Sequence, residues 1–297
     1  MADCPIPNPI DKPMTETVVP LSHNALDLYL SRTEGVHTAP EKHILLLHGV
    51  TYSSHEFDIP YRDYSLVRAL VQKGYCVWRL DIAGYGRSVT VEDGFLPDSD
   101  FAAEEISLAV SKIVQETGQD RIDLLGWSWG TVTVGRYAAR HPEHLRRLVL
   151  YAPILCGLGQ EDIAEPFHRN TWEHAAGDFQ TAPGGSPDPA IADPILVEMW
   201  CSSCWHYDGD SSPNGGRRDI CVDPSVRLID LKAIQTPTLV ICGDRDPYLN
   251  YNVVRSCLSE LPPGSSLEII EGGSHAVFVE KPWYREFRKR LFRFLLQ

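Results

Sequence analysis

Short apolar stretches alternate along the chain with longer stretches in which apolar and polar residues mix. Eight of the short stretches have the length of strands, and they lie at residues 16–19, 26–31, 44–47, 76–80, 122–125, 148–151, 238–242 and 267–270. Several of them are apolar throughout, which is typical of strands that helices cover on both faces. The pattern predicts an α/β fold with a mostly parallel, eight-stranded sheet.

The stretches between these strands carry the periodicity of helices. They lie at residues 64–72, 101–116, 131–140, 253–260 and 283–296. In the second of them, Ile106, Ala109, Val110 and Ile113 fall three and four residues apart, which places them on one buried face. We therefore expect helices on both faces of the sheet.

The alternation stops between about residues 154 and 229, where prolines, glycines and acidic residues gather and strand signals are missing. An interruption of this kind indicates a segment inserted into the core. We predict a mainly helical cap at 154–229, with the core built from residues 1–153 and 230–297.

One helix is expected inside the predicted cap. Ile191, Ile195, Leu196, Met199 and Trp200 recur at near-helical spacing, which predicts an amphipathic helix over the edge of the sheet. The region is also rich in aromatic rings. Such a helix could roof an apolar pocket, or it could pack for stability alone.

Composition and charge limit the classes of partner. The chain has 297 residues, 43% of them hydrophobic, and a formal net charge of −13. This charge repels nucleic acid and anionic membrane surfaces, and no apolar run approaches the roughly 20 residues that span a bilayer. The start of the chain, residues 1–5, lacks the basic and apolar regions of a signal peptide. We expect a soluble, cytoplasmic protein that acts on a small molecule and binds neither nucleic acid nor membrane; its oligomeric state is not indicated.

The eight cysteines are expected to be free thiols, because a chain of this length without a signal peptide is a poor candidate for a disulfide framework. Cys201, Cys204, His206 and Cys221 form the one cluster with metal-like spacing. A second matching pair of ligands is missing. We predict neither a metal nor an organic cofactor.

The stretch Gly126-Trp127-Ser128-Trp129-Gly130 follows an apolar strand directly and precedes a predicted helix. A serine becomes a useful nucleophile when a sharp strand-to-helix turn presents its hydroxyl to a base, and such a turn crowds the residues two positions away on either side. Glycine at both positions relieves the crowding. The pattern predicts a nucleophile elbow at Ser128.

Candidates for an acid and a base follow at later strand ends. Asp244 and Asp246 lie in the loop after 238–242, and His275 lies in the loop after 267–270. Because the carboxyl ends of parallel strands meet at one edge of a sheet, we expect both loops to lie near Ser128. The order along the chain is serine, aspartate, histidine.

Five motifs in this order resemble those of the α/β-hydrolase fold superfamily of cap-bearing serine hydrolases. They are Leu47-His48-Gly49-Val50, the stretch DIAGYGRS at 81–88, the elbow at 126–130, Gly243-Asp244-Arg245-Asp246 and Gly273-Ser274-His275. The resemblance spans the chain from about residue 18 to its end, and the predicted cap is its divergent part.

Acyl transfer on this fold needs a nucleophile, a base and an orienting acid. We expect Ser128 to attack, His275 to take its proton, and Asp246 to orient the imidazole. Asp244 lies nearer to the strand end, but the family pattern places the acid three residues after the glycine, at Asp246; Asp230 is a more remote candidate.

The resemblance also implies an oxyanion hole made by the backbone N–H groups of Val50 and Trp129. His48 is expected to brace that loop rather than to react. His55, a few residues further on, is expected to lie at the surface.

The candidates for substrate contact are all aromatic residues near the predicted nucleophile or in the cap. They are Tyr52, Trp127, Trp200 and Tyr248. Each could instead serve packing alone.

A serine nucleophile argues against the haloalkane dehalogenases and most epoxide hydrolases of this superfamily, which use aspartate. We predict hydrolysis of a carboxylic ester, thioester or lactone of a partly apolar small molecule. The alternatives are an acyltransferase, a carbon–carbon bond hydrolase, and a ligand-binding receptor with a slow or vestigial triad. A carbon–carbon bond hydrolase usually holds a substrate carboxylate with basic residues, for which the cap offers His168, Arg169, Arg217 and Arg218.

Overall fold

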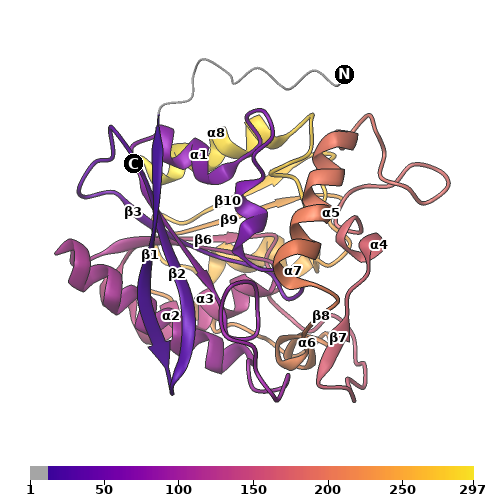
Figure 1. The fold of residues 1–297 in the computed structure, drawn as a ribbon, viewed down its shortest axis with the longest axis horizontal. Helices are drawn as coiled ribbons and strands as arrows, with labels where there is room; N and C mark the ends of the chain where they lie inside the picture. Colours follow the sequence, from indigo (N-terminus) through magenta and orange to yellow (C-terminus); the bar gives the residue numbers. More distant parts are fainter. Residues whose placement is uncertain (1–12) are drawn as a thin grey trace.

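A computed structural model describes residues 13–297, so the prediction about residues 1–5 lies outside the described part. An eight-stranded sheet forms its centre (Figure 1). Its strands are β1 (Met14–His23), β2 (Leu26–Gly35), β3 (His43–Leu47), β4 (Cys76–Asp81), β5 (Ile122–Trp127), β6 (Leu145–Tyr151), β9 (Thr238–Gly243) and β10 (Ser266–Ile270). The strand order is β1-β2-β4-β3-β5-β6-β9-β10, with β2 antiparallel to both neighbours and all other pairs parallel. The predicted eight-stranded, mostly parallel sheet is confirmed.

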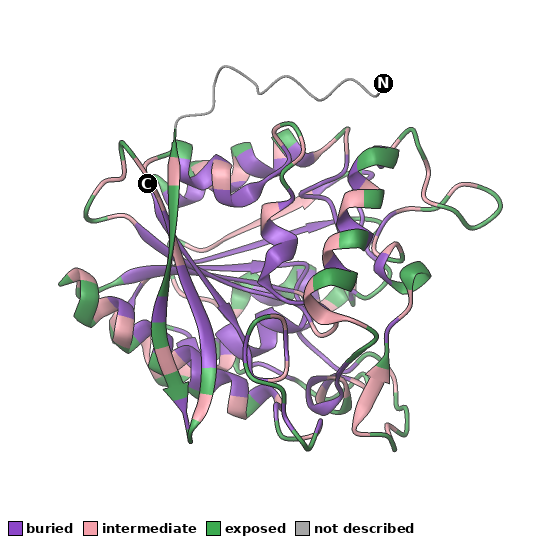
Figure 2. Cartoon of the chain, in the orientation of Figure 1, coloured by how far each residue is buried: buried purple, intermediate pink, exposed green. Residues whose placement is uncertain are grey.

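Each strand sends alternate side chains to opposite faces of the sheet. In β3, Ile44 and Leu46 join one hydrophobic core, whereas Leu45 and Leu47 join the other. The first core is covered by α1 (Leu66–Gln72) and α8 (Tyr284–Leu295), and the second by α2 (Ser99–Thr117), α3 (Trp129–Arg140) and α7 (Tyr251–Ser256). Figure 2 shows the inner strands of the sheet buried between these helices, whereas the edge strand β1 is largely exposed. The predicted cover of helices on both faces is confirmed.

The helix ends follow local chemistry that the sequence carries. The Asp98 side chain caps α2 by accepting from the N–H groups of Asp100 and Phe101, and Gly118 ends the helix at a φ of 68°. The helix expected at 253–260 is shorter than predicted, because α7 gives way to a 3-10 turn, η4 (Cys257–Ser259). The other 3-10 turns are η1 (Ser54–Asp58), η2 (Pro142–His144) and η3 (Leu231–Ala233).

The chain between β6 and β9 leaves the sheet and lies on one side of the molecule (Figure 1). It contains α4 (Trp172–Ala175), α5 (Pro194–Asp208) and α6 (Gly215–Ile220), with a small antiparallel pair of strands, β7 (Phe167–Arg169) and β8 (Ser211–Pro213). The sequence shows no signal for this pair of strands. Strands of three residues are too short to show an alternating pattern.

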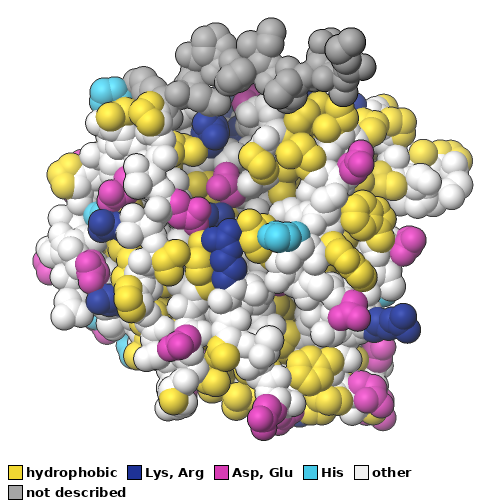
Figure 3. Space-filling view, viewed as in Figure 1, with side chains coloured by type: hydrophobic (Ala, Val, Ile, Leu, Met, Phe, Trp, Pro, Cys, Tyr) yellow, Lys and Arg dark blue, Asp and Glu magenta, His cyan; other side chains and the backbone are white. Residues whose placement is uncertain are grey.

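The α5 helix buries only part of the expected face, because Leu196 and Trp200 are buried whereas Ile195 is not. Its N-cap is Asp193 and its first residue is Pro194, so Ile191 precedes the helix. Ile195 is 52% exposed, and hydrophobic side chains show at the surface over α5 in Figure 3. The buried residues of this helix are Leu196, Trp200, Cys201 and Cys204, which pack onto the core beneath α1 and α8.

No helix within residues 13–297 is long and apolar enough to cross a membrane. The seven cysteines in this part of the chain are free thiols. Cys201 and Cys204 are buried in the core, and the same residues contain no group of three His, Cys, Asp or Glu side chains placed to hold a metal ion.

Candidate active site

The sharp turn between β5 and α3 holds Ser128 at a φ of 57° and a ψ of −124°. A non-glycine residue with positive φ costs on the order of 1–3 kcal/mol, so the surrounding structure must impose it. Both flanking glycines are required sterically. A Cβ on Gly126 would lie 2.3 Å from the carbonyl oxygen of Gly130, and one on Gly130 would lie 2.6 Å from that of His48. The predicted elbow therefore has a steric cause in the packed structure.

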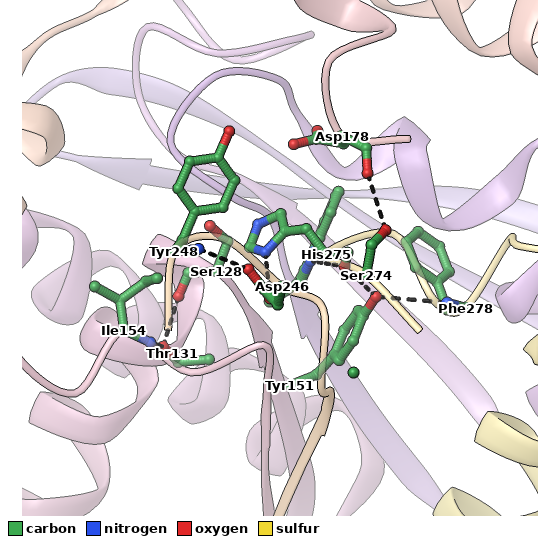
Figure 4. Close-up of polar contacts among 12 residues, drawn as sticks. Ser128, Thr131, Tyr151, Ile154, Asp178, Asp246, Tyr248, Ser274, His275 and Phe278 are labelled. Carbon is green, nitrogen blue, oxygen red and sulfur yellow. Dashed lines mark hydrogen bonds and ion pairs between the residues drawn. The ribbon is translucent and has the colours of Figure 1, made fainter. Parts of the chain in front are cut away.

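Ser128, His275 and Asp246 lie next to one another, as Figure 4 shows. His275 Nδ1 is 2.7 Å from Asp246 Oδ2, and both side chains are buried. The backbone N–H of Tyr248 donates to the other carboxylate oxygen of Asp246 at 3.0 Å. With Nδ1 donating to this carboxylate, Nε2 is the ring nitrogen left to accept a proton.

The structure distinguishes the three candidate acids. Asp244 accepts a hydrogen bond from the backbone N–H of Gly272 at 2.7 Å, which ties together the loops after β9 and β10. Asp230 precedes η3. Asp246 is the candidate that contacts His275.

The backbone of His275 is held by side chains at the ends of two neighbouring strands, β5 and β6. The Trp127 indole N–H donates to the His275 carbonyl at 3.2 Å, and the Tyr151 hydroxyl donates to the same oxygen. The preceding residue, Ser274, donates to the Glu280 carboxylate from both its hydroxyl and its backbone N–H. These bonds fix the position of the His275 backbone and, through it, the position of the imidazole.

The charge state of His275 is set by two opposing effects. Burial lowers the pKa of the imidazole, but the adjacent Asp246 carboxylate and its hydrogen bond raise it, and the net pKa lies above the usual value. A raised pKa suits a base that must hold a proton while a bond is being made.

The two expected oxyanion donors are Val50, in the loop after β3, and Trp129, the first residue of α3. His48 Nδ1 lies 2.7 Å from the carbonyl oxygen of Gly49, and its Nε2 accepts from the backbone N–H of Ile82 at 3.1 Å, so this histidine braces the loop as expected. The N–H groups of Val50 and Trp129 donate to no other group in residues 13–297. The Trp129 side chain points away, since its indole N–H donates to Ser99 Oγ at 2.9 Å and the ring is fully buried.

A cavity of about 430 Å³ opens at Ser128 and His275. Its wall includes Val50, Tyr52, Trp127 and Tyr248. The Tyr248 ring stands edge-on to the imidazole, with centroids 4.8 Å apart. Three of the four aromatic candidates for substrate contact therefore face the cavity.

Trp200 does not line this cavity, contrary to expectation. It is fully buried and packs edge-on against Trp127, with ring centroids 6.0 Å apart, and also against Phe179 and Phe278. The face that α5 turns toward the core decides this, and it could not be read from spacing alone. Trp200 therefore supports the Trp127 ring by packing against it.

The cavity wall also carries charged groups that the motifs did not reveal. Glu56 follows the oxyanion loop, while Asp178 and Arg217 come from the segment between β6 and β9. Burial raises the pKa of Glu56 well above its usual value and raises that of Asp178 as well. Arg217 was one of four basic candidates, whereas Glu56 and Asp178 carry no signal in the sequence.

His55 is buried rather than at the surface. Its Nδ1 lies 2.9 Å from Ser53 Oγ and 3.4 Å from a carboxylate oxygen of Asp208, the last residue of α5. Asp208 also accepts from the backbone N–H groups of Ser53 at 3.1 Å and Gly86 at 2.9 Å. This cluster fastens the end of α5 to two loops of the core.

Residues 42–185 match the family model described as alpha/beta hydrolase fold. With the sheet and the strand-end loops described above, the chain belongs to the α/β-hydrolase fold superfamily.

Two named proteins and one solved structure are similar to this chain over most of its length. The chain is 24% identical over 258 residues to a non-heme chloroperoxidase of Kitasatospora aureofaciens, covering 77% of this chain and 85% of the relative. It is also 24% identical over 219 residues to the pimeloyl-acyl-carrier-protein methyl ester esterase of Yersinia enterocolitica, covering 68% and 77%. The crystal structure of naproxen esterase from Bacillus subtilis superposes with a TM-score of 0.64 at 19% identity, covering 95% of this chain and 92% of that one. Together they support a hydrolase.

Proposed function

We propose that this protein hydrolyses a carboxylic ester, thioester or lactone of a partly apolar small molecule through an acyl-enzyme on Ser128. The observation that carries the proposal is the 2.7 Å contact of His275 with Asp246 beside a serine held at a positive φ in a cavity wall. The esterases among the similar proteins support the same chemistry.

The reaction runs in two halves. His275 Nε2 takes the Ser128 proton as Oγ bonds to the carbonyl carbon, and then passes that proton to the departing alcohol or thiol as its bond to carbon breaks. Water then attacks the acyl-enzyme, His275 takes the proton of water, and Ser128 recovers it as the acid leaves. Asp246 stabilises the imidazolium formed in each half without taking the proton itself.

The N–H groups of Val50 and Trp129 are proposed to bind the oxyanion of each tetrahedral intermediate. Both belong to backbone that is held in place, one by the His48-braced loop and one by the first turn of α3. A donor of this kind typically contributes about 3 kcal/mol to lowering the barrier.

Labelling and turnover test the proposal together. A fluorophosphonate should bond to Ser128, and hydrolysis of p-nitrophenyl acetate should vanish in Ser128→Ala but persist in Ser225→Ala, whose serine is exposed. If the wild-type protein neither takes the label nor turns over any acyl substrate, the proposal is wrong and a ligand-binding role replaces it.

Perhydrolysis is a second candidate, favoured by the likeness to a protein named as a non-heme chloroperoxidase. Hydrogen peroxide would replace water in attacking the acyl-enzyme, which releases a peroxy acid and restores the serine. The expected result is peroxide-dependent oxidation of a halide in acetate buffer that disappears in Ser128→Ala. Ester hydrolysis without such oxidation would exclude this second activity.

A further inference from the structure

The guanidinium of Arg217 lies in the wall of the cavity that holds Ser128 and His275. It is partly buried, and its hydrogen bonds within residues 13–297 go to neutral groups: Thr51 Oγ1 at 2.6 Å, Ser212 Oγ at 3.2 Å and Asn214 Oδ1 at 3.3 Å. It forms no ion pair with any Asp or Glu in residues 13–297. Buried cations in proteins are normally paired, so this one calls for an explanation.

The other basic residues of this region do not share its position. Arg218 lies over the Phe95 ring, 4.5 Å from its centroid, and Arg169 is exposed. His168 does line the cavity, but burial first, and then the charge of Arg217, lower its pKa to about 4, which leaves it neutral at neutral pH. Arg217 is thus the one Lys or Arg among the described residues of the wall.

Acidic groups of the same wall leave that charge uncompensated. Burial raises the pKa of Glu56 and Asp178, which favours their neutral forms. Glu161 and Glu173 are exposed, where solvent screens them. The carboxyl that acts on the Arg217 pKa is Glu161, and its effect is smaller than that of burial.

We infer that Arg217 binds an anionic group, a carboxylate, on the substrate, so that the preferred substrate is an ester that also carries a free carboxylate. This inference rests on the proposed function, because the ester bond must reach Ser128. Guanidinium and carboxylate match in a planar, two-bond geometry, and Arg stays charged in any environment. Ser212 and Asn214 hold one side of the guanidinium and orient the rest.

The position of Arg217 limits the length of such a substrate. Its Nη2 contacts Thr51, the residue directly after Val50, whose N–H is the proposed oxyanion donor. Consecutive Cα atoms are about 3.8 Å apart, so the carboxylate lies only a few bonds from the ester carbonyl. A cavity of about 430 Å³ fits a small molecule of this kind.

Matched esters test the charge alone. The probes are the monomethyl esters of succinate, glutarate and adipate, each compared with the methyl ester in which a carboxamide replaces the free carboxylate. Wild-type kcat/KM should favour the carboxylate by about 10- to 100-fold for at least one chain length, which is the range of a hydrogen bond to a charged group. Arg217→Gln should remove that preference while retaining turnover of the carboxamide ester, and Arg217→Lys should restore part of it.

The matched control is Arg218→Gln, next in the chain and outside the cavity wall, which should keep the wild-type preference. Equal rates for both members of every pair in the wild-type protein would overturn the inference while the proposed hydrolase stands. Equal loss of both substrates in Arg217→Gln would also overturn it, since that result assigns Arg217 to holding Thr51 and Ser212 in place.

Binding to Ser128→Ala separates the inference from the proposed function. Calorimetry with the same ester pairs should show tighter binding of the carboxylate, by about 10-fold or more, and loss of that difference when Arg217→Gln is added. This result would support the anion site even if no turnover were found and the hydrolase proposal failed. Equal binding of the two members would overturn the anion site.

Discussion

Replacing Asp246 by asparagine removes one charge from a buried pair and leaves the shape of the side chain. In the wild-type protein the carboxylate lies 2.7 Å from His275 Nδ1, which places the centres of the two charges about 4 Å apart when the imidazole is protonated. At an effective dielectric constant of about 20, two unit charges at that separation interact by about 4 kcal/mol. Asp246→Asn should therefore lower kcat/KM by about 1,000-fold.

The same change should move the pH profile. Activity needs neutral His275, so the rate rises with pH through the pKa of this residue. That pKa is lowered by burial but raised overall by Asp246, so the wild-type midpoint should lie above the usual histidine value. In Asp246→Asn the raising effect is lost and burial remains, so the residual activity should have its midpoint at lower pH.

The assay is kcat/KM for p-nitrophenyl acetate between pH 5 and 9, with Asp244→Asn as the matched control. Asp244 bonds to the Gly272 backbone rather than to the imidazole, so its variant should keep the wild-type midpoint. A flat profile in the wild-type protein, or a larger loss in Asp244→Asn than in Asp246→Asn, would refute the assignment of base and acid.

Three further predictions concern the packing around the site. Gly130→Ala places a Cβ 2.6 Å from the His48 carbonyl oxygen, so the free energy of unfolding should fall by about 1–3 kcal/mol with loss of activity, measured by urea denaturation and ester turnover. Trp127→Phe removes one of two donors to the His275 carbonyl, and kcat should fall by about 10-fold with the fold intact by circular dichroism. Burial raises the pKa of Asp208 to about 7, above its unfolded value of about 4, so its contribution to stability is present below pH 4 and lost as pH rises toward 7. The urea midpoint should therefore fall more between about pH 4 and pH 7 in the wild-type protein than in Asp208→Asn. An equal fall in both proteins would contradict the raised pKa of Asp208.

The parts of the site that could be predicted lie within a few residues of a strand end. Ser128, Asp246 and His275 each sit in a loop that directly follows an apolar strand, and the geometry of a parallel sheet brings such loops to one edge. The two elbow glycines follow from the crowding expected of such a turn. The packed structure adds a second cause at Gly130, where a Cβ would lie 2.6 Å from the carbonyl oxygen of His48.

The roles of His55, Trp200 and Arg217 could not be read in this way. His55 is buried because α5 ends against its loop at Asp208, and Trp200 is buried because α5 begins at Pro194 and turns that face inward. Each case depends on contact between segments more than a hundred residues apart or on the rotation of one helix. The spacing of residues along the chain reveals neither these long-range contacts nor the rotation of the helix.

The layered α/β sheet and the order of nucleophile, acid and base can be read from the residues alone, because apolar periodicity and turn chemistry act over a few residues. The folded structure was needed to show that the Trp127 indole donates to the His275 carbonyl and that Arg217 enters the cavity, whereas the family pattern already favours Asp246 over Asp244. These contacts join residues distant in the chain, and burial then sets their charges. The physical reason is that desolvation and long-range packing exist only once the chain has folded.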